Sequence, residues 1–159
     1  MIFVTLGTQD KPFNRLLNEI QKQIVNKNIN DKVIVQAGCT EYTSSDMQIF
    51  DLLPMDEFSE LIEKCDLLIT HGGVGSIIEG LKKNKKVIAV PRKAKYGEHV
   101  NDHQQQIIEN FNAEGYIIGV NDVSELSDAL LRAKKFKPKK YKSNTNNMIE
   151  LVEKIIKDF

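Results

Sequence analysis

The chain has 159 residues, of which 41% are hydrophobic and 28% charged, and these values are ordinary for one soluble globular domain. Its 22 Lys and Arg residues balance its 22 Asp and Glu residues, so the overall charge gives no attraction to a phosphate polymer, and nucleic acid is disfavoured as a partner. No basic segment precedes the first apolar run, and no stretch approaches the ~20 apolar residues of a membrane span, so we expect neither an export signal nor a transmembrane helix.

The predicted elements alternate between strands and helices. Short β-branched and apolar runs predict six strands, at residues 2–6, 33–35, 48–50, 67–70, 87–90 and 116–118. Apolar residues at three- and four-residue spacing predict helices between them, at about 13–24, 56–64, 76–83, 101–111 and 122–134. Asp56 is expected to cap the second helix, and Asp122 with Glu125 to form a capping box at the last.

The pattern of the strands predicts the fold class. Strands that are apolar on both faces, separated by helices, belong to a parallel sheet that helices cover on both sides. We therefore expect an α/β protein: a single Rossmann-like domain over residues 1–135, with a six-stranded, doubly wound parallel sheet. The two cysteines, Cys39 and Cys65, lack a metal-type spacing and favour a reducing, cytoplasmic setting.

Residues 136–159 are predicted to form a basic linker and an amphipathic C-terminal helix. The lysine-rich stretch 134–142 is followed by no acidic residue until Glu150, and it either is a solvated linker or contacts an anionic membrane or an acidic partner. Beyond it, one apolar stripe recurs at helical spacing: Met148, Leu151, Val152, Ile155, Ile156 and Phe159. This stripe either closes over its own sheet or binds another chain.

Two glycine-containing segments follow strands at the edge where an open parallel sheet binds its ligand. Gly7 and Thr8 follow the first strand, where glycine lets a ligand approach backbone N–H groups. Residues 70–79 hold three glycines between a buried strand and a helix start, a combination that binds phosphate. Within this segment His71 can donate a hydrogen bond to a phosphate oxygen or a leaving group.

The same segment also ends in a Ser-x-x-Glu pattern. Ser76 and Glu79 fit a capping box, which any protein can use to start a helix. Taken singly, the pair favours capping. Together with His71 and the glycines, it favours contact with a ligand.

A third polar segment, residues 91–104, follows the fifth strand. Carboxylate and amide groups such as those of Asp102 and Gln104 suit vicinal sugar hydroxyls, because each offers two polar atoms. His99 and His103 are four residues apart and could share a helix face with Asp102 as zinc ligands. An H-E-x-x-H arrangement is absent and no third ligand is evident, so we expect no metal. A plain surface helix is the remaining alternative.

Together these segments resemble a known family. Residues 71–79 follow the His-x-Gly-x-x-Ser-x-x-Glu donor signature, and residues 3–8, 90–92 and 97–104 complete the order of motifs in the C-terminal, nucleotide-sugar-binding domain of glycosyltransferase family 28. The chain is similar to stand-alone versions of this domain: the PssE-type subunit of exopolysaccharide and capsule β-1,4-galactosyltransferases, and the small soluble subunit of the N-glycan UDP-N-acetylglucosamine transferase. The resemblance covers residues 1 to about 135 and implies the C-terminal half of a GT-B fold.

The resemblance also implies a role for each site residue. The diphosphate of a UDP-sugar is expected to lie among Gly7, Thr8, Gly73, Gly75 and Ser76. Glu79 would accept hydrogen bonds from the ribose hydroxyls, and the residues around Leu53 would contact uracil. Those at or beside the sugar-contacting positions are Glu98, Asp102, His103 and Gln104, and the catalytic candidates are His71 and His99. Two departures stand out: Gly75 replaces the Asn or Thr of many members, which leaves that contact to the backbone, and His103 replaces what is often another residue.

The resemblance implies a two-component enzyme, because a GT-B enzyme needs two such domains and this chain supplies one. A membrane-associated partner subunit would bring the lipid-linked saccharide acceptor and the base, at the cytoplasmic face of the membrane. The expected activity is an inverting, metal-free transfer of galactose or N-acetylglucosamine from a UDP-sugar, with no cofactor. Abundant Lys, Asn and Ile suggest a low-GC bacterium and favour exopolysaccharide or capsule synthesis.

Two other function classes stay open. The chain could be a non-catalytic module that binds a nucleotide or stabilises its partner. It could also be a metal-dependent hydrolase that uses His71, His99 and His103.

Overall fold

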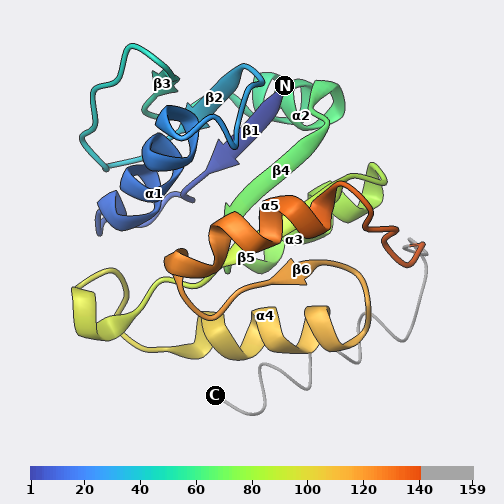
Figure 1. Cartoon of the computed structure of the whole chain (residues 1–159). Coiled ribbons are helices and arrows are strands. Elements are labelled where there is room, and N and C mark those ends of the chain that lie inside the picture. Colours follow the sequence, from blue (N-terminus) through green and yellow to red (C-terminus); the bar gives the residue numbers. More distant parts are fainter. Residues whose placement is uncertain (141–159) are drawn as a thin grey trace.

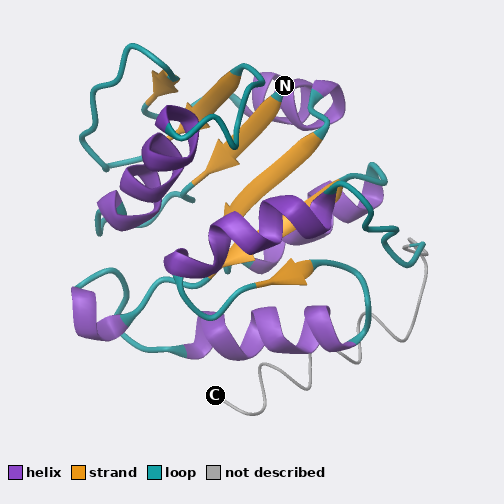
Figure 2. Cartoon of the chain, in the orientation of Figure 1, coloured by secondary structure: helices purple, strands orange, loops and turns teal. Residues whose placement is uncertain are grey.

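The computed structural model describes residues 1–140, so the predicted helix over 148–159 lies outside the described residues. They form six strands and five α-helices, with an α-helix after every strand except β2 (Figures 1 and 2). The bounds are β1 Ile2–Thr5, α1 Asn14–Val25, β2 Val33–Gln36, β3 Gln48–Phe50, α2 Met55–Lys64, β4 Leu67–His71, α3 Val74–Lys82, β5 Lys86–Val90, α4 His103–Ala113, β6 Ile118–Gly119 and α5 Leu126–Ala133, with short 3-10 helices η1 Ala94–Tyr96 and η2 Val123–Glu125. The predicted strands and helices are confirmed, with ends displaced by a few residues.

The six strands form one parallel sheet in the order β3-β2-β1-β4-β5-β6. The chain changes its direction of winding between β1 and β4: β1 pairs with β2 through Ile2 and Val33, and with β4 through Ile2 and Leu67. This order confirms the predicted doubly wound sheet. Ligands of such sheets bind beyond the carboxyl ends of the strands at this reversal, so a ligand-binding site is expected at the loops after β1 and β4.

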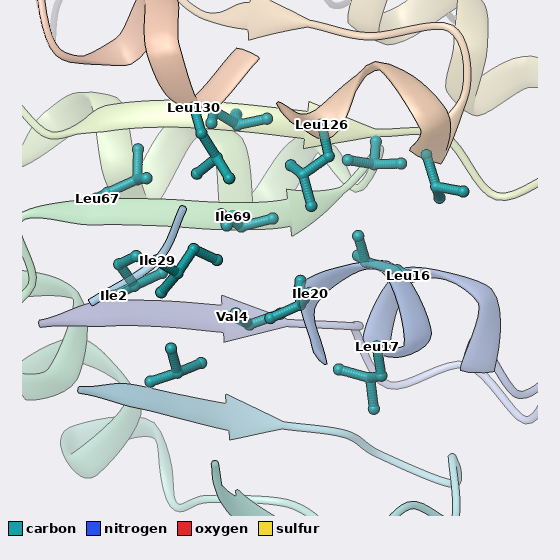
Figure 3. Packing of buried hydrophobic residues seen from close by; sticks show 14 of the residues in the cluster. Ile2, Val4, Leu16, Leu17, Ile20, Ile29, Leu67, Ile69, Leu126 and Leu130 are labelled. Atoms are coloured by element: carbon teal, nitrogen blue, oxygen red, sulfur yellow. The ribbon is translucent and has the colours of Figure 1, made fainter. Parts of the chain in front are cut away.

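Two apolar layers, one on each face of the sheet, hold the fold together. Helices α1 and α5 cover the face nearest the viewer in Figure 1, whereas α2, α3 and α4 cover the other. Figure 3 shows the first layer, in which helix side chains point toward strand side chains: Leu16, Leu17, Ile20, Leu126 and Leu130 toward Ile2, Val4, Leu67 and Ile69. Each such side chain contributes about 1.5–3 kcal/mol when fully buried.

The predicted helix caps have different outcomes. The capping box is confirmed, because the Asp122 side chain accepts from the backbone of Ser124 and Glu125 reaches back to the N–H of Asp122. It caps η2, which leads directly into α5. The prediction for Asp56 is wrong, since α2 begins after Pro54 and Asp56 lies in its first turn. There its charge still complements the helix dipole.

Residues 136–140, the first part of the predicted linker, have no regular secondary structure. They nevertheless contact the domain, because the Lys139 N–H donates to the Gly115 carbonyl at 3.0 Å and its ammonium lies 5.4 Å from the centre of the Tyr116 ring. Across the described stretch, 1–140, no helix has the length and apolar character needed to cross a bilayer.

Two glycines of α3 provide a matched test of this packing. A Cβ at Gly80 would lie 2.8 Å from Leu68 and 2.9 Å from Val87, whereas no described atom lies within 4 Å of a Cβ at Gly75. We expect Gly80→Ala to lower the free energy of unfolding by about 1–3 kcal/mol through overpacking. Gly75→Ala should instead raise it by about 0.5 kcal/mol, because alanine favours a helix. Urea unfolding followed by circular dichroism measures both, and equal effects would contradict the packing described.

Candidate functional site

A cavity of about 500 Å³ opens at the carboxyl ends of β1 and β4, where the winding of the sheet reverses. Its walls come from the loops after these strands, the end of β2, the loop before α2 and the start of α3. The predicted site residues that line it are Gly7, Thr8, Leu53, His71, Gly73, Gly75, Ser76 and Glu79. The structure therefore brings together one catalytic candidate and the residues assigned to diphosphate, ribose and uracil.

The imidazole of His71 occupies the space that two glycines leave open. His71 is the last residue of β4 and is only 6% exposed. A Cβ at Gly7 would lie 2.4 Å from its Nε2, and one at Gly73 would lie 2.7 Å from the same atom. Gly7 also has φ +79°, a left-handed conformation that side chains disfavour. These glycines thus admit the histidine ring, a role that sequence reasoning did not assign to them.

Gln104 lies behind the cavity and is not part of its lining. Its side chain is 4% exposed, and its Oε1 accepts hydrogen bonds from the backbone N–H groups of Gly72 at 3.2 Å and Arg92 at 3.1 Å. Its Nε2 lies 3.1 Å from Nδ1 of His71. A Cβ at Gly72 would come within 2.6 Å of the Gln104 side chain. The amide predicted to touch the sugar therefore fastens the loops after β4 and β5 to α4.

Arg92 is a buried cation whose role the sequence does not predict, although it lies in the motif at residues 90–92. Its side chain is 1% exposed and donates to the carbonyl oxygens of Leu6, of Lys11 at 2.7 Å and of Glu98 at 3.0 Å. Its Nε has no hydrogen-bond partner among residues 1–140. Burial lowers the pKa of Arg92, although the neighbouring Cys39 and Glu98 oppose this. An arginine two residues after a buried strand was the available signal.

The carboxylate of Glu98 is engaged inside the protein and does not line the cavity. Both of its oxygens accept from Arg15 at 3.0 Å, and one also accepts from the Lys93 N–H at 3.0 Å. Arg15 continues the network to Asp122 at 2.8 Å and lies 4.4 Å from the centre of the Tyr96 ring. This ion-pair network joins α1, the loop after β5 and the start of η2.

The polar residues at the start of α4 also make local contacts outside the cavity wall. Asp102 accepts from the N–H of Ala94 at 2.9 Å, and Nδ1 of His99 accepts from the N–H of Asn101 at 3.2 Å. The N–H of His103 donates to the Asn101 side chain at 3.0 Å. In the part of the chain that the structure describes, no three His, Cys, Asp or Glu side chains gather as metal ligands. The alternative of a metal-dependent hydrolase therefore finds no support.

Helix α3 presents its N-terminus to the cavity. Gly73 is the N-cap residue, and no side chain among the described residues caps this helix. Ser76 lies in its first turn, so the capping-box interpretation of Ser76 and Glu79 is wrong. Both side chains line the cavity instead. The N–H groups of a first helical turn lack intrahelical partners and carry the positive end of the dipole, so this end of the cavity favours an anion.

The electrostatics keep His71 neutral. Burial lowers the pKa of His71 to about 3, and the charge of Arg92 acts in the same direction. At neutral pH the ring can donate or accept a hydrogen bond but does not carry a charge. A neutral ring at this pH does not favour an imidazolium as general acid in the free protein.

Comparison with known proteins places this geometry among glycosyltransferases. Residues 1–159 match the family model described as the glycosyltransferase family 28 C-terminal domain. The UDP-N-acetylglucosamine transferase subunit ALG13 of Candida glabrata is 33% identical over 95 residues, which make up 58% of this chain and 46% of that protein. The solution structure of ALG13 has a TM-score of 0.65 and 22% identity, covering 98% of this chain and 96% of that one, and it shows the same fold.

A second curated relative is a larger enzyme. The UDP-N-acetylglucosamine–N-acetylmuramyl-(pentapeptide) pyrophosphoryl-undecaprenol N-acetylglucosamine transferase of Prochlorococcus marinus is 26% identical over 147 residues, which cover 88% of this chain and 40% of that enzyme. The chain thus spans less than half the length of these two curated relatives.

The burial of His71 predicts a pH dependence of stability. Its pKa is about 3 when folded and 6.5 when exposed, so between these values the unfolded chain binds more protons at residue 71 than the folded one. The contribution of His71 to the free energy of unfolding is fully present above pH 6.5. It falls by up to about 1.4 kcal/mol per pH unit as the pH drops toward 3. We expect His71→Gln to have a shallower dependence between pH 6.5 and 4 in urea unfolding. Parallel curves for the two proteins would contradict a buried neutral histidine.

Proposed function

The chain belongs to glycosyltransferase family 28, as a C-terminal domain of that family, and on this premise we propose that it binds a UDP-sugar as the donor-binding subunit of a two-component glycosyltransferase. The observation that carries the proposal is the cavity at the reversal of the sheet. One end of it meets the N-terminus of α3, which no described side chain caps, and the other is bordered by apolar side chains of Leu53 and Phe58. An anionic group and a flat apolar ring fit these two ends.

UDP matches this arrangement group by group. The diphosphate would lie against the N–H groups of the first turn of α3, between Thr8 and Ser76. Glu79 lines the same cavity, and within residues 1–140 its carboxylate has only long contacts, 3.4 Å to the Ser59 hydroxyl and 3.6 Å to the Lys83 ammonium. It therefore retains acceptor capacity for two ribose hydroxyls. Uracil would lie beside Leu53, whose N–H donates to the Gln36 side chain at 3.0 Å.

The same residues suit the departure of UDP. When the bond between sugar and diphosphate breaks, negative charge develops on the leaving phosphate. The dipole of α3 and the positive charge of the buried Arg92 favour that charge, in positions fixed before the reaction. Because His99 does not line the cavity, we assign the base that activates the acceptor to the partner subunit and not to His99.

The identities of sugar, acceptor and partner are part of the proposal. The sugar is galactose or N-acetylglucosamine, and the acceptor is a lipid-linked saccharide held by a membrane-associated subunit at the cytoplasmic face. Two relatives support this: ALG13 is a transferase subunit, and the Prochlorococcus marinus enzyme acts on an undecaprenol-linked substrate. The composition of the chain favours exopolysaccharide or capsule synthesis.

Calorimetry with UDP tests the proposed donor site. We expect Glu79→Ala to weaken binding by about 1.5–3 kcal/mol, the value of a hydrogen bond to a charged group. Glu63→Ala is the matched control, because Glu63 is the other carboxylate near the Lys83 ammonium, at 3.8 Å, and does not line the cavity. It should leave UDP affinity within twofold. Equal affinity of the Glu79 variant and the parent would remove the ribose contact, and equal binding of UDP, ADP and GDP would remove the uracil assignment.

A truncation tests the proposed partner. The apolar stripe between Met148 and Phe159 lies outside the described residues, and we propose that it helps to hold the acceptor-binding subunit. Removing residues 144–159 should abolish co-purification with the subunit encoded beside this chain, and transfer with it, while UDP binding persists. Survival of complex and activity would place the docking surface elsewhere. If the truncated chain does not fold, the pair Leu151→Asp and Ile155→Asp replaces it.

A further inference from the structure

We infer that Gln104 is a positioning residue: it holds His71 as a neutral imidazole that carries its proton on Nε2 and presents this N–H between Gly7 and Gly73. Sequence resemblance assigns Gln104 to the sugar, whereas its buried amide contacts only protein groups in the hydrogen bonds described above. The inference rests on the proposed function only in naming the diphosphate as the group that the N–H meets.

The orientation of the Gln104 amide follows from its backbone partners. The N–H groups of Gly72 and Arg92 both point at one end of the amide, at 3.2 and 3.1 Å. Both are donors, so that end must be the carbonyl oxygen, which has two lone pairs to accept them. The NH₂ group is therefore at the other end. A flipped amide would place its NH₂ group against two buried N–H donors and leave all of them without an acceptor.

The orientation of the amide in turn selects the tautomer of His71. The NH₂ group is 3.1 Å from Nδ1 of the ring, and an amide nitrogen can only donate. Nδ1 must then accept, so it carries no proton. A neutral imidazole has one N–H, which is therefore on Nε2. Protonation of both nitrogens would set two donors against each other.

The charged surroundings agree with a neutral ring. Arg92 and His99 are the charged or titratable groups that act on His71 among the described residues, and both disfavour the imidazolium, as burial does. The Nε2 edge lies toward Gly7 and Gly73, which line the cavity with His71. The N–H is thus aimed at the wall where the diphosphate would lie. As charge grows on departing UDP, this hydrogen bond strengthens without any proton being transferred.

Nitrogen-15 NMR of the imidazole rings in the full chain tests the inference without a ligand. The chain has three histidines, and His71→Gln identifies the signals of residue 71 by their loss. Between pH 5 and 8 we expect a pyrrole-type Nε2 and a pyridine-type Nδ1 for His71, with no titration. A proton on Nδ1, or a titration in this range, would overturn the inference, and this measurement needs no variant of Gln104.

Gln104→Glu provides the second measurement. A carboxylate can still accept from Gly72 and Arg92, but its other oxygen now needs a proton on Nδ1 of His71. We expect the signal of Nδ1 to become that of a protonated nitrogen at pH 6. Gln105→Glu is the control, since it adds the same charge one residue later on α4, where Gln105 contacts Glu109 at an exposed position. An unchanged tautomer in Gln104→Glu would show that Gln104 does not set it.

Addition of UDP separates this inference from the proposed function. The Nε2 proton should move downfield when UDP saturates the wild-type chain. If UDP does not bind in calorimetry while the tautomer is as expected, the proposed function fails and the positioning role of Gln104 holds. If UDP binds while the proton is on Nδ1, the positioning role of Gln104 fails and the proposed function holds.

Discussion

A buried amide, that of Gln104, determines how the loops of this site lie. From its place on α4, this amide accepts hydrogen bonds from the backbone of the loops after β4 and β5, and it lies against the His71 ring at the end of β4. It therefore holds these two loops and α4 together. Its removal would leave two backbone N–H groups and an imidazole nitrogen without partners in a dry interior, at about 1–3 kcal/mol each. The cavity wall thus keeps its shape through a side chain that does not line the cavity.

The order of the strands determines where the cavity lies, and the buried polar groups around it determine its hydrogen bonds and charge. Parallel pairing on both sides of β1 brings the loops after β1 and β4 side by side, as any doubly wound sheet with this order does. Arg92 then ties the loop after β5 to the carbonyl oxygens of Leu6 and Lys11 in the loop after β1. A cation held by carbonyl groups keeps more of its field than one paired with a carboxylate, so Arg92 adds a positive potential behind the loop after β1.

Sequence reasoning predicted the strands, the helices and most of the cavity lining, because apolar periodicity and strand-loop order are local properties. It missed the functions of Arg92, Glu98 and Gln104, since their partners lie far away in the sequence: Gln104 meets His71 across 33 residues and Arg92 meets Leu6 across 86. Local patterns were also ambiguous. Asp122 and Glu125 form a true capping box, whereas Ser76 and Glu79 have the same spacing inside a helix that starts at Val74. Spacing alone cannot locate the first turn.

The His71 ring lies between Gly7 and Gly73 and restricts the substitutions that these two positions tolerate, but to different degrees. Gly73 has φ −76° and ψ 125°, which any residue adopts, so only the ring of His71 forbids a side chain there. Once residue 71 is small, a larger residue at 73 becomes tolerable, and after that substitution the histidine cannot return without a clash. Gly7 gains no such freedom, because its φ of +79° stays unfavourable for a side chain whatever occupies position 71. Histidine at position 71 and a side chain at position 73 therefore exclude each other, while position 7 requires glycine whatever residue is at position 71.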